Sequence, residues 1–285
     1  MTDTIGAVFA FVVGACVGSF LNVCVARWPL DLSVVRPRSR CPRCAHEIAW
    51  YDNIPMVSWM VLRGRCRGCG LPISAQYPLV EFLVALGWMA AATRFGLSFE
   101  ALRIAVFGTT LLGIALTDAK HYLIPDGFTI SGLVWILATS IVSTVQGETS
   151  LFATTYDAFV GACVGAGAIS IVGWLGEVML KREAMGFGDV TLMALVGAAL
   201  GPPRTFLTVF VGALLGAVAF VGIVYPLVRH RGSRDVEQIE LLEGASRPEM
   251  PQVPFGVFLA PAALVALLWG QPLIDWYLRR ALLLP

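Results

Sequence analysis

The chain alternates between long apolar stretches and short polar connections, a pattern typical of proteins that cross a membrane repeatedly. Backbone polar groups in hydrocarbon must be satisfied within their own segment, so each apolar stretch is predicted to be a helix. The stretches run roughly over residues 5–26, 77–95, 101–118, 127–146, 155–178, 189–202, 205–228 and 254–273, the sixth being short and glycine-rich. We therefore expect an all-α polytopic membrane protein with about eight transmembrane helices.

Two polar segments divide the chain. After a first helix within residues 1–26, residues 27–76 are rich in proline and arginine and contain four clustered cysteines. The remaining residues 77–285 form the helical membrane core, interrupted by a polar connection at 229–253.

Composition supports the membrane assignment and excludes one class of partner. Hydrophobic residues make up 57% of the 285 residues and charged residues 14%, against about a quarter charged in soluble domains. The net charge of +1 argues against nucleic-acid binding, which needs a basic excess. The first four residues lack the basic region of a cleavable signal, so the first apolar stretch is expected to be retained.

The distribution of basic residues predicts the orientation in the membrane. With the N-terminus outside, 15 of the 20 Lys and Arg residues fall in cytoplasmic loops. Five fall on the opposite side: Arg94, Arg103, Arg204, Arg279 and Arg280. This asymmetry predicts an N-out topology with residues 27–76 in the cytoplasm.

Two aspartates border apolar stretches and are candidates for chemistry. Asp118 ends the third stretch and Asp189 opens the sixth, so the predicted topology puts both at the cytoplasmic border. A carboxylate within an apolar span is costly and is a functional candidate by default. Two adjacent carboxylates share a proton, so one can activate water while the other polarises a carbonyl. Gly186 and Gly188 would let an extended substrate strand approach the backbone.

Helix-end roles are the alternative. Asp189 at a helix start would cap it favourably, whereas Asp118 at a helix C-terminus has the wrong sign for the helix dipole. Asp126 is a rival to both, but it follows a proline at the start of a predicted helix, which favours a capping role.

The clustered cysteines form two C-x-x-C pairs, Cys41/Cys44 and Cys66/Cys69, with 21 residues between the pairs. Four thiolates from two such pairs are typical of structural zinc, and the cytoplasm disfavours disulfides; a redox pair is the alternative. His46 is surplus to a four-cysteine site and is expected to be solvated. The other three cysteines lie in apolar runs and are predicted to be buried: Cys16, Cys24 and Cys163.

Several motifs, in order along nearly the whole chain, resemble the bacterial type IV prepilin peptidases, which are GxGD membrane aspartyl proteases. The resemblance is carried by Gly186-Phe187-Gly188-Asp189, by Thr117-Asp118 through Ile124-Pro125-Asp126, and by Gly18-Ser19-Phe20-Leu21-Asn22, Tyr51-Asp52-Asn53-Ile54-Pro55, Gly64-Arg65-Cys66-Arg67, Tyr77-Pro78 with Glu81, and Pro254-Phe255-Gly256. One departure is Thr191, where the family commonly has a lysine.

The resemblance implies that Asp118 and Asp189 are the catalytic pair, in an enzyme of the bacterial inner membrane. Family members cleave the leader from prepilins and pseudopilins at the cytoplasmic face, and many methylate the new N-terminus with S-adenosylmethionine. The cysteine loop is associated with methylation. Glu81, an acid just inside the second predicted span, is a candidate for the methylation site or for orienting the loop; a hydrogen-bonded structural role is the alternative. A peptidase that has lost methylation, or a zinc-binding membrane scaffold or transporter, also remains open.

Overall fold

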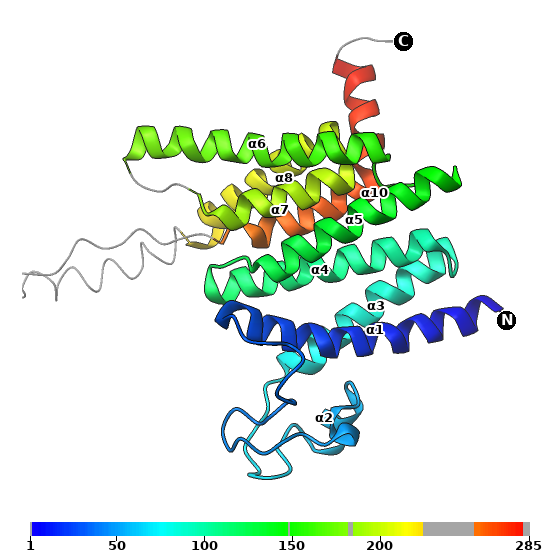
Figure 1. Ribbon diagram of the computed structural model, residues 1–285, viewed down its shortest axis with the longest axis vertical. Coiled ribbons are helices and arrows are strands. Elements are labelled where there is room, and N and C mark those ends of the chain that lie inside the picture. Colours follow the sequence, from blue (N-terminus) through cyan, green and yellow to red (C-terminus); the bar gives the residue numbers. More distant parts are fainter. Residues whose placement is uncertain (1, 148, 182–184, 225–253, 282–285) are drawn as a thin grey trace, which may run out of the picture.

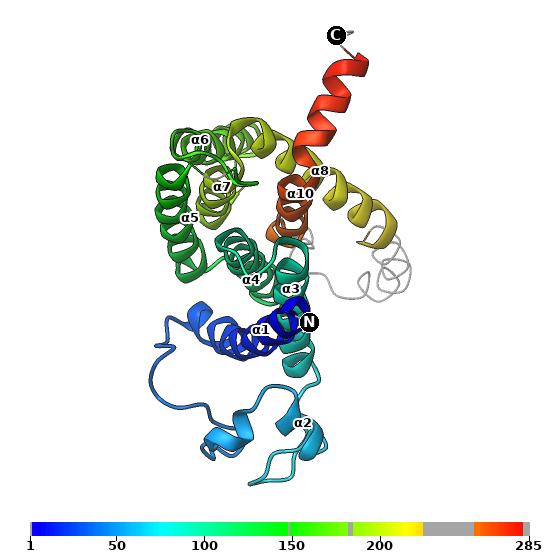
Figure 2. The same cartoon turned by 90° about the vertical axis from the view of Figure 1, so that its right-hand side faces the viewer.

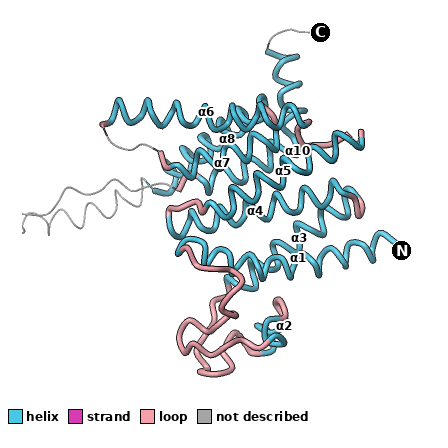
Figure 3. The backbone as a smooth tube through the Cα atoms, viewed as in Figure 1, coloured by secondary structure: helices cyan, strands magenta, loops and turns pink. Residues whose placement is uncertain are grey.

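A computed structural model describes residues 2–147, 149–181, 185–224 and 254–281 of the chain. Within these ranges the regular structure is helical, with no β-strand, only two isolated bridges in the cysteine-containing segment (Figure 3). The expected all-α class is confirmed. The polar connection expected at 229–253 lies outside the described residues.

Most of the described chain is in long apolar helices. They are α1 (Thr2–Arg27), α3 (Gln76–Phe95), α4 (Phe99–His121), α5 (Asp126–Gln146), α6 (Thr155–Leu180), α7 (Phe187–Leu200), α8 (Pro202–Ala219), which continues as the π-helical turn η3 (Phe220–Val224), and α10 (Gly256–Ala281). Apart from α7, each of these helices is long and apolar enough to cross a membrane, which gives seven candidate spans among the described residues.

The sixth predicted span, 189–202, corresponds to α7, which differs from the others. Its 14 residues rise about 21 Å, less than the roughly 30 Å of a bilayer's hydrocarbon core. Leu192, Met193, Leu195 and Val196 are fully buried, and α7 packs against α5, α6, α8 and α10. Its apolar composition therefore reflects burial within protein, and a short helix suffices there.

The helices lie side by side with alternating directions (Figures 1 and 2). α1 packs mainly against α3, α6 against α7, and α10 against α8 and α4. Short connections join α4 to α5 and α6 to α7, so the last turn of α4 and the first turns of α5 and α7 share one end of the bundle. The segment between α1 and α3 extends beyond the bundle, as Figure 1 shows.

Glycines allow the closest helix contacts, as their spacing predicts. A methyl group on Gly161 of α6 would collide with the backbone carbonyl of Gly197 on α7, and the reverse also holds. A methyl group on Gly18 of α1 would lie 2.7 Å from the Cα of Glu81 on α3. These positions bring the helix backbones together without intervening side chains.

The segment between α1 and α3 holds three short helices: η1 (Trp28–Leu30), η2 (Trp50–Asn53) and α2 (Val57–Val61). Trp28 packs edge-on against Phe128 of α5, with ring centroids 4.4 Å apart. The predicted burial of the three cysteines outside this segment was right only for Cys24, because Cys16 and Cys163 lie on exposed helix faces.

Candidate functional site

Asp118 lies in the last turn of α4 and its side chain is buried. The helix continues to His121 and ends at Tyr122, which adopts the left-handed conformation (φ 52°) and donates its backbone N–H to the Asp118 carbonyl. The Asp118 carboxylate accepts a hydrogen bond from the backbone N–H of Val257 at 3.2 Å. The first turn of α10 thus supplies a donor that orients the carboxyl on α4.

Asp189 lies in the first turn of α7, two residues after the helix begins at Phe187. Gly186 is the N-cap residue, and its carbonyl accepts the Asp189 backbone N–H at 3.1 Å. The half-buried Asp189 carboxyl lies close enough to Asp118 for the two charges to repel each other. The structure therefore brings together two acids that are 71 positions apart in the sequence.

Ile124 packs between the segments that hold the two aspartates. A methyl group on Gly188 would lie 2.9 Å from Cβ of Ile124. A methyl group on Gly256 would lie 3.2 Å from Cδ1 of Ile124 and 2.9 Å from Oδ2 of Asp118. Both glycines are therefore needed for close packing around the acid pair. Gly186 has more room, since the nearest atom to an added methyl group is Oδ2 of Asp189, at 3.8 Å.

Asp126, the rival acid, has a different environment. It is the exposed first residue of α5, and its side chain makes no capping hydrogen bond. A carboxylate in the first turn still favours the positive end of the helix dipole. Asp118 and Asp189 are the acids at this end of the bundle whose charges repel each other, and two carboxyls that repel in this way can hold different protonation states.

The four cysteines of the segment between α1 and α3 converge. The sulfur atoms of Cys41, Cys44, Cys66 and Cys69 all lie within 4.8 Å of one another. Cys41 and Cys69 are 4.0 Å apart, and Cys44 and Cys66 are 3.9 Å apart. Sulfur ligands at about 2.3 Å from a tetrahedral zinc ion are separated by roughly 3.8 Å, so the cluster has the dimensions of such a site. These residues could bind a metal ion.

The two halves of the cluster repeat the same backbone turn. The N–H of Cys41 donates to the His46 carbonyl and that of Cys66 to the Leu71 carbonyl, each at 2.9 Å. In both halves the residue four positions after the first cysteine, Ala45 or Gly70, has positive φ and donates back to that cysteine. Backbone N–H groups directed at the sulfur lower the pKa of Cys41 to about 6, whereas desolvation and the neighbouring thiols raise the pKa of Cys44 to about 11, so Cys41 forms the thiolate that metals bind more readily than Cys44 does.

An ion pair fastens the second half of the cluster to η2. Arg67, between the cysteines of the second pair, donates two hydrogen bonds of 2.6 Å to the Asp52 carboxylate and lies over the Tyr51 ring. The arginine lowers the pKa of Asp52 below its ordinary range. His46 is exposed, as expected, and its ring packs against Gly68.

Glu81 lies on α3 where that helix meets the cysteine-containing segment. It is buried, and its Oε2 accepts the backbone N–H of Met56 at 2.7 Å. Asn22 of α1 donates to the Tyr77 carbonyl nearby, at 3.1 Å. Glu81 therefore helps to hold the segment on the helices, and this contact is compatible with either role considered for it.

Comparisons with known proteins cover most of the chain. Residues 12–95 match the bacterial peptidase A24 N-terminal domain, and residues 105–221 match the type IV leader peptidase family. The chain is 42% identical over 234 residues to the prepilin leader peptidase/N-methyltransferase of Myxococcus xanthus, which covers 82% of this chain and 67% of the relative. It is 33% identical over 291 residues to the protein of the same description from Pseudomonas aeruginosa, covering 94% and 92%.

The chain belongs to the type IV leader peptidase family. An Escherichia coli relative described as a type 4 prepilin-like proteins leader peptide-processing enzyme is 35% identical over 244 residues, which cover 79% of this chain and 86% of the relative. No solved structure matched the chain. Membership of this leader peptidase family agrees with the resemblance found in the motifs.

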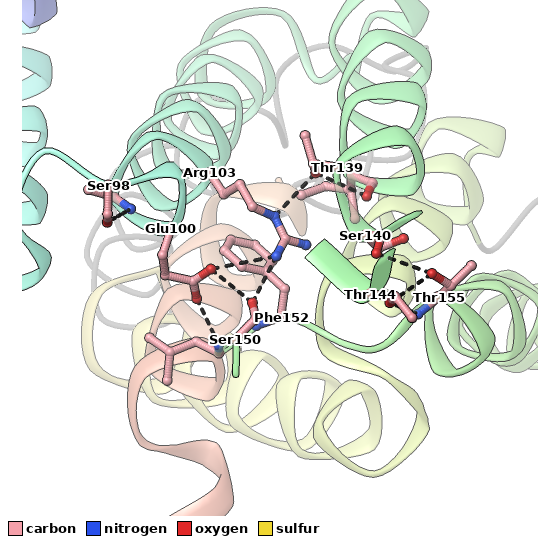
Figure 4. A network of polar contacts seen from close by, with 12 residues as sticks. Ser98, Glu100, Arg103, Thr139, Ser140, Thr144, Ser150, Phe152 and Thr155 are labelled. Carbon is pink, nitrogen blue, oxygen red and sulfur yellow. Dashed lines mark hydrogen bonds and ion pairs between the residues drawn. The ribbon is translucent and has the colours of Figure 1, made fainter. Parts of the chain in front are cut away.

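Sequence reasoning missed two features of this leader peptidase family member. The first is the Val257 N–H at Asp118, although Pro254-Phe255-Gly256 was recognised as a motif. The second is a polar network at the opposite end of the bundle, centred on Arg103 of α4 (Figure 4). Arg103 is fully buried, donates to Thr139 and Ser150, and lies 4.2 Å from the centre of the Phe152 ring. The sequence did hold a signal for this network: Glu100 lies three residues before Arg103, a spacing that puts the two charges on one face of a helix, where they can form an ion pair.

Proposed function

We propose that this protein is a membrane aspartyl endopeptidase that removes the leader peptide of type IV prepilins or pseudopilins and N-methylates the new N-terminus. The observation that carries the proposal is the meeting of Asp118 and Asp189 at one end of the helix bundle. A transporter would place its polar groups near the middle of the membrane, often at broken helices. The paired acids here lie instead at the ends of two helices.

The orientation follows from the charge distribution. The cysteine-containing segment and the acid pair lie at the same end of the bundle, where α1 ends, α3 begins and α4 ends. The excess of basic residues in the loops at this end supports a cytoplasmic position for it, with the N-terminus outside. A substrate helix in the bacterial inner membrane would then present its leader to the acid pair at the cytoplasmic border.

The proposed cleavage uses the two carboxyls in different protonation states. One carboxylate removes a proton from a water molecule, which attacks the scissile carbonyl, while the protonated partner donates a hydrogen bond to the carbonyl oxygen. The proton then passes to the leaving amine. The Val257 N–H holds the Asp118 carboxyl in place, and Gly186, where an added methyl group would meet no atom closer than 3.8 Å, leaves room for an extended strand.

We also propose that Cys41, Cys44, Cys66 and Cys69 hold a structural zinc ion. Sulfur separations of 3.9 and 4.0 Å and the repeated backbone turn fit a closed tetrahedral site. When bound, the metal would cross-link a segment that has little hydrophobic core of its own. Purified protein is expected to contain about one zinc per chain, and the combined Cys41→Ser and Cys44→Ser change should release it. Stoichiometric zinc in that variant would refute the ligand assignment.

The printed descriptions of the relatives support the second activity. S-adenosylmethionine is the methyl donor implied by the family resemblance, and the amine exposed by cleavage is the acceptor. A peptidase that has lost methylation is the competing possibility. Mass spectrometry of the mature N-terminus separates the two, because cleavage without methylation gives a mass lower by one CH2 unit.

The test is co-expression with a prepilin. Asp118→Asn and Asp189→Asn should each abolish leader removal, while the protein stays in the membrane and keeps its zinc. Asp126→Asn is the matched control, since it changes an exposed acid at the same end of the bundle and should cleave normally. Full cleavage by either of the first two variants would refute the acid pair.

A further inference from the structure

Two adjoining cavities lie where the cysteine-containing segment meets α1 and α3. The larger has a volume of about 450 Å³ and the smaller about 340 Å³, within the range of small-molecule sites. Five residues line both cavities: Ser19, Val23, Arg27, Ser39 and Asn53. The two spaces therefore share one wall along the cytoplasmic half of α1.

The larger cavity combines aromatic, acidic and basic groups. Trp59 and Tyr77 line it together with Asp52, Glu81 and four arginines: Arg27, Arg40, Arg43 and Arg67, the last of which is paired with Asp52. The indole of Trp59 is anchored by a 3.2 Å hydrogen bond to the Ile73 carbonyl. Aromatic side chains bind the flat face of a nucleobase and also attract cations, and carboxylates attract a sulfonium. These groups suit a nucleoside that carries a sulfonium centre.

The smaller cavity reaches the outer surface of α1. Cys16 and Phe20 line it from exposed positions on that helix, and Val34 and Val35 line it from the loop. The exposed face of α1 is apolar and is expected to contact lipid. An apolar N-terminal residue at the end of a membrane helix could therefore enter this cavity from the bilayer side.

Glu81 lines the larger cavity beside the wall of α1 that the two cavities share. Its backbone packs against Gly18, and the next residue of α1, Ser19, lines both spaces. The hydrogen bond from Met56 holds the carboxylate in place at 2.7 Å. A fixed carboxylate between a donor and an acceptor is placed to receive a proton from the acceptor.

We propose that the larger cavity binds S-adenosylmethionine, that the smaller cavity receives the new N-terminal residue of the processed substrate, and that Glu81 is the base between them. This inference rests on the proposed methyltransferase function and assigns its site. The N-terminal ammonium gives a proton to Glu81, and the amine nitrogen then attacks the methyl carbon. The carbon–sulfur bond breaks with its electron pair on sulfur, so S-adenosylhomocysteine leaves, and the methylated amine remains.

Two cavity-filling variants and one charge variant test the assignment. Ala26 lines only the larger cavity and Cys16 only the smaller. Ala26→Trp should weaken S-adenosylhomocysteine binding, measured by calorimetry, by at least about tenfold through steric exclusion. Cys16→Trp should leave the affinity for S-adenosylhomocysteine unchanged. Both the Ala26→Trp and the Cys16→Trp variants should lose methylation while leader cleavage continues. Glu81→Gln should lower the methylation rate by about 100-fold, the contribution of a positioned base. Val12→Trp is the control, because Val12 is exposed on α1 and lines neither cavity.

The outcomes are distinct. Unchanged S-adenosylhomocysteine affinity in Ala26→Trp, or methylation near the wild-type rate in Cys16→Trp or Glu81→Gln, would overturn the assignment. Wild-type protein that cleaves and never methylates would overturn the proposed methyltransferase function as well. Ultraviolet cross-linking of radiolabelled S-adenosylmethionine to the wild-type protein needs no variant. Label within residues 19–81 supports the larger cavity, and label confined to α4 through α10 contradicts it.

Discussion

The backbone N–H of Val257 donates to the Asp118 carboxylate at 3.2 Å, across 139 positions of sequence. This contact joins the first turn of α10 to the last turn of α4. The neighbouring Gly256 has no room for a side chain, because an added methyl group would lie 2.9 Å from Oδ2 of Asp118. The orientation of one proposed catalytic acid thus depends on the backbone of a distant helix.

Substitution of Gly256 should impair cleavage without removing an acid. In Gly256→Ala the methyl group displaces the Asp118 carboxyl, and small displacements of catalytic groups cost up to about 100-fold in rate. We expect the leader-cleavage rate to fall by about 10- to 100-fold. Gly216→Ala on α8 is the control, since its methyl group would meet Phe258 at an ordinary 3.6 Å. Equal rates for the two variants would contradict this role of Gly256.

The contact between α6 and α7 predicts a stability effect. Gly161→Ala places a methyl group against the Gly197 carbonyl and forces the helices apart. Overpacking of this kind costs about 1–3 kcal/mol, so the thermal midpoint in detergent should fall. Gly167→Ala in the same helix meets no atom within 4 Å and should be neutral or slightly stabilising. A midpoint for Gly161→Ala at or above the wild-type value would be inconsistent with the packing described.

Much of the fold could be predicted because apolar stretches and isolated acids have clear local signals. Asp118 and Asp189 were found because charges at the edges of apolar runs are rare, and the cysteines because of their spacing. The character of α7 could not be predicted, since an apolar helix has the same composition whether it faces lipid or protein. The Val257 N–H could not be predicted either, because a backbone donor has no residue signature.

Arg103 illustrates the limit of charge counting. It was counted among the basic residues outside the cytoplasm, but the structure buries it within α4, paired with Glu100 at 3.5 Å. A positive charge near a helix end is expected in a loop or at the interface. Only the arrival of Thr139, Ser150 and Phe152 from other segments makes burial possible.

Removal of Arg103 should strongly destabilise the bundle. Arg103→Ala leaves the Glu100 carboxylate without its cation and breaks the contacts that hold residues 150–152 to α4 (Figure 4). Breaking a buried pair by removing one partner costs about 3–5 kcal/mol. Arg94→Ala on α3 removes an exposed arginine and should cost less than about 1 kcal/mol. Thermal unfolding in detergent compares the two, and similar midpoints would contradict the structural importance of the network.

The Asp52–Arg67 pair should slow metal loss from the four-cysteine site. Asp52→Asn removes a partly exposed ion pair, so zinc release to a chelator should become about two- to fivefold faster. Arg67 holds the pKa of Asp52 below its ordinary value near 4. The pair therefore stabilises the folded segment fully above pH 4, and this stabilisation is lost only as the pH falls through the lowered pKa of Asp52. The ratio of release rates should therefore stay constant from pH 6 to 8. A ratio that changed over this range, or equal rates, would contradict the assignment.

The cleavage rate of a purified prepilin by Asp118→Asn, Asp189→Asn and the double variant is the most direct test of the account. Residues that act as one unit are strongly non-additive, so the double variant should be no slower than either single variant, and all three should be at the background rate. Measurable cleavage by either single variant, with a further loss in the double variant, would mean that the two carboxyls act independently and that the proposed acid pair is wrong.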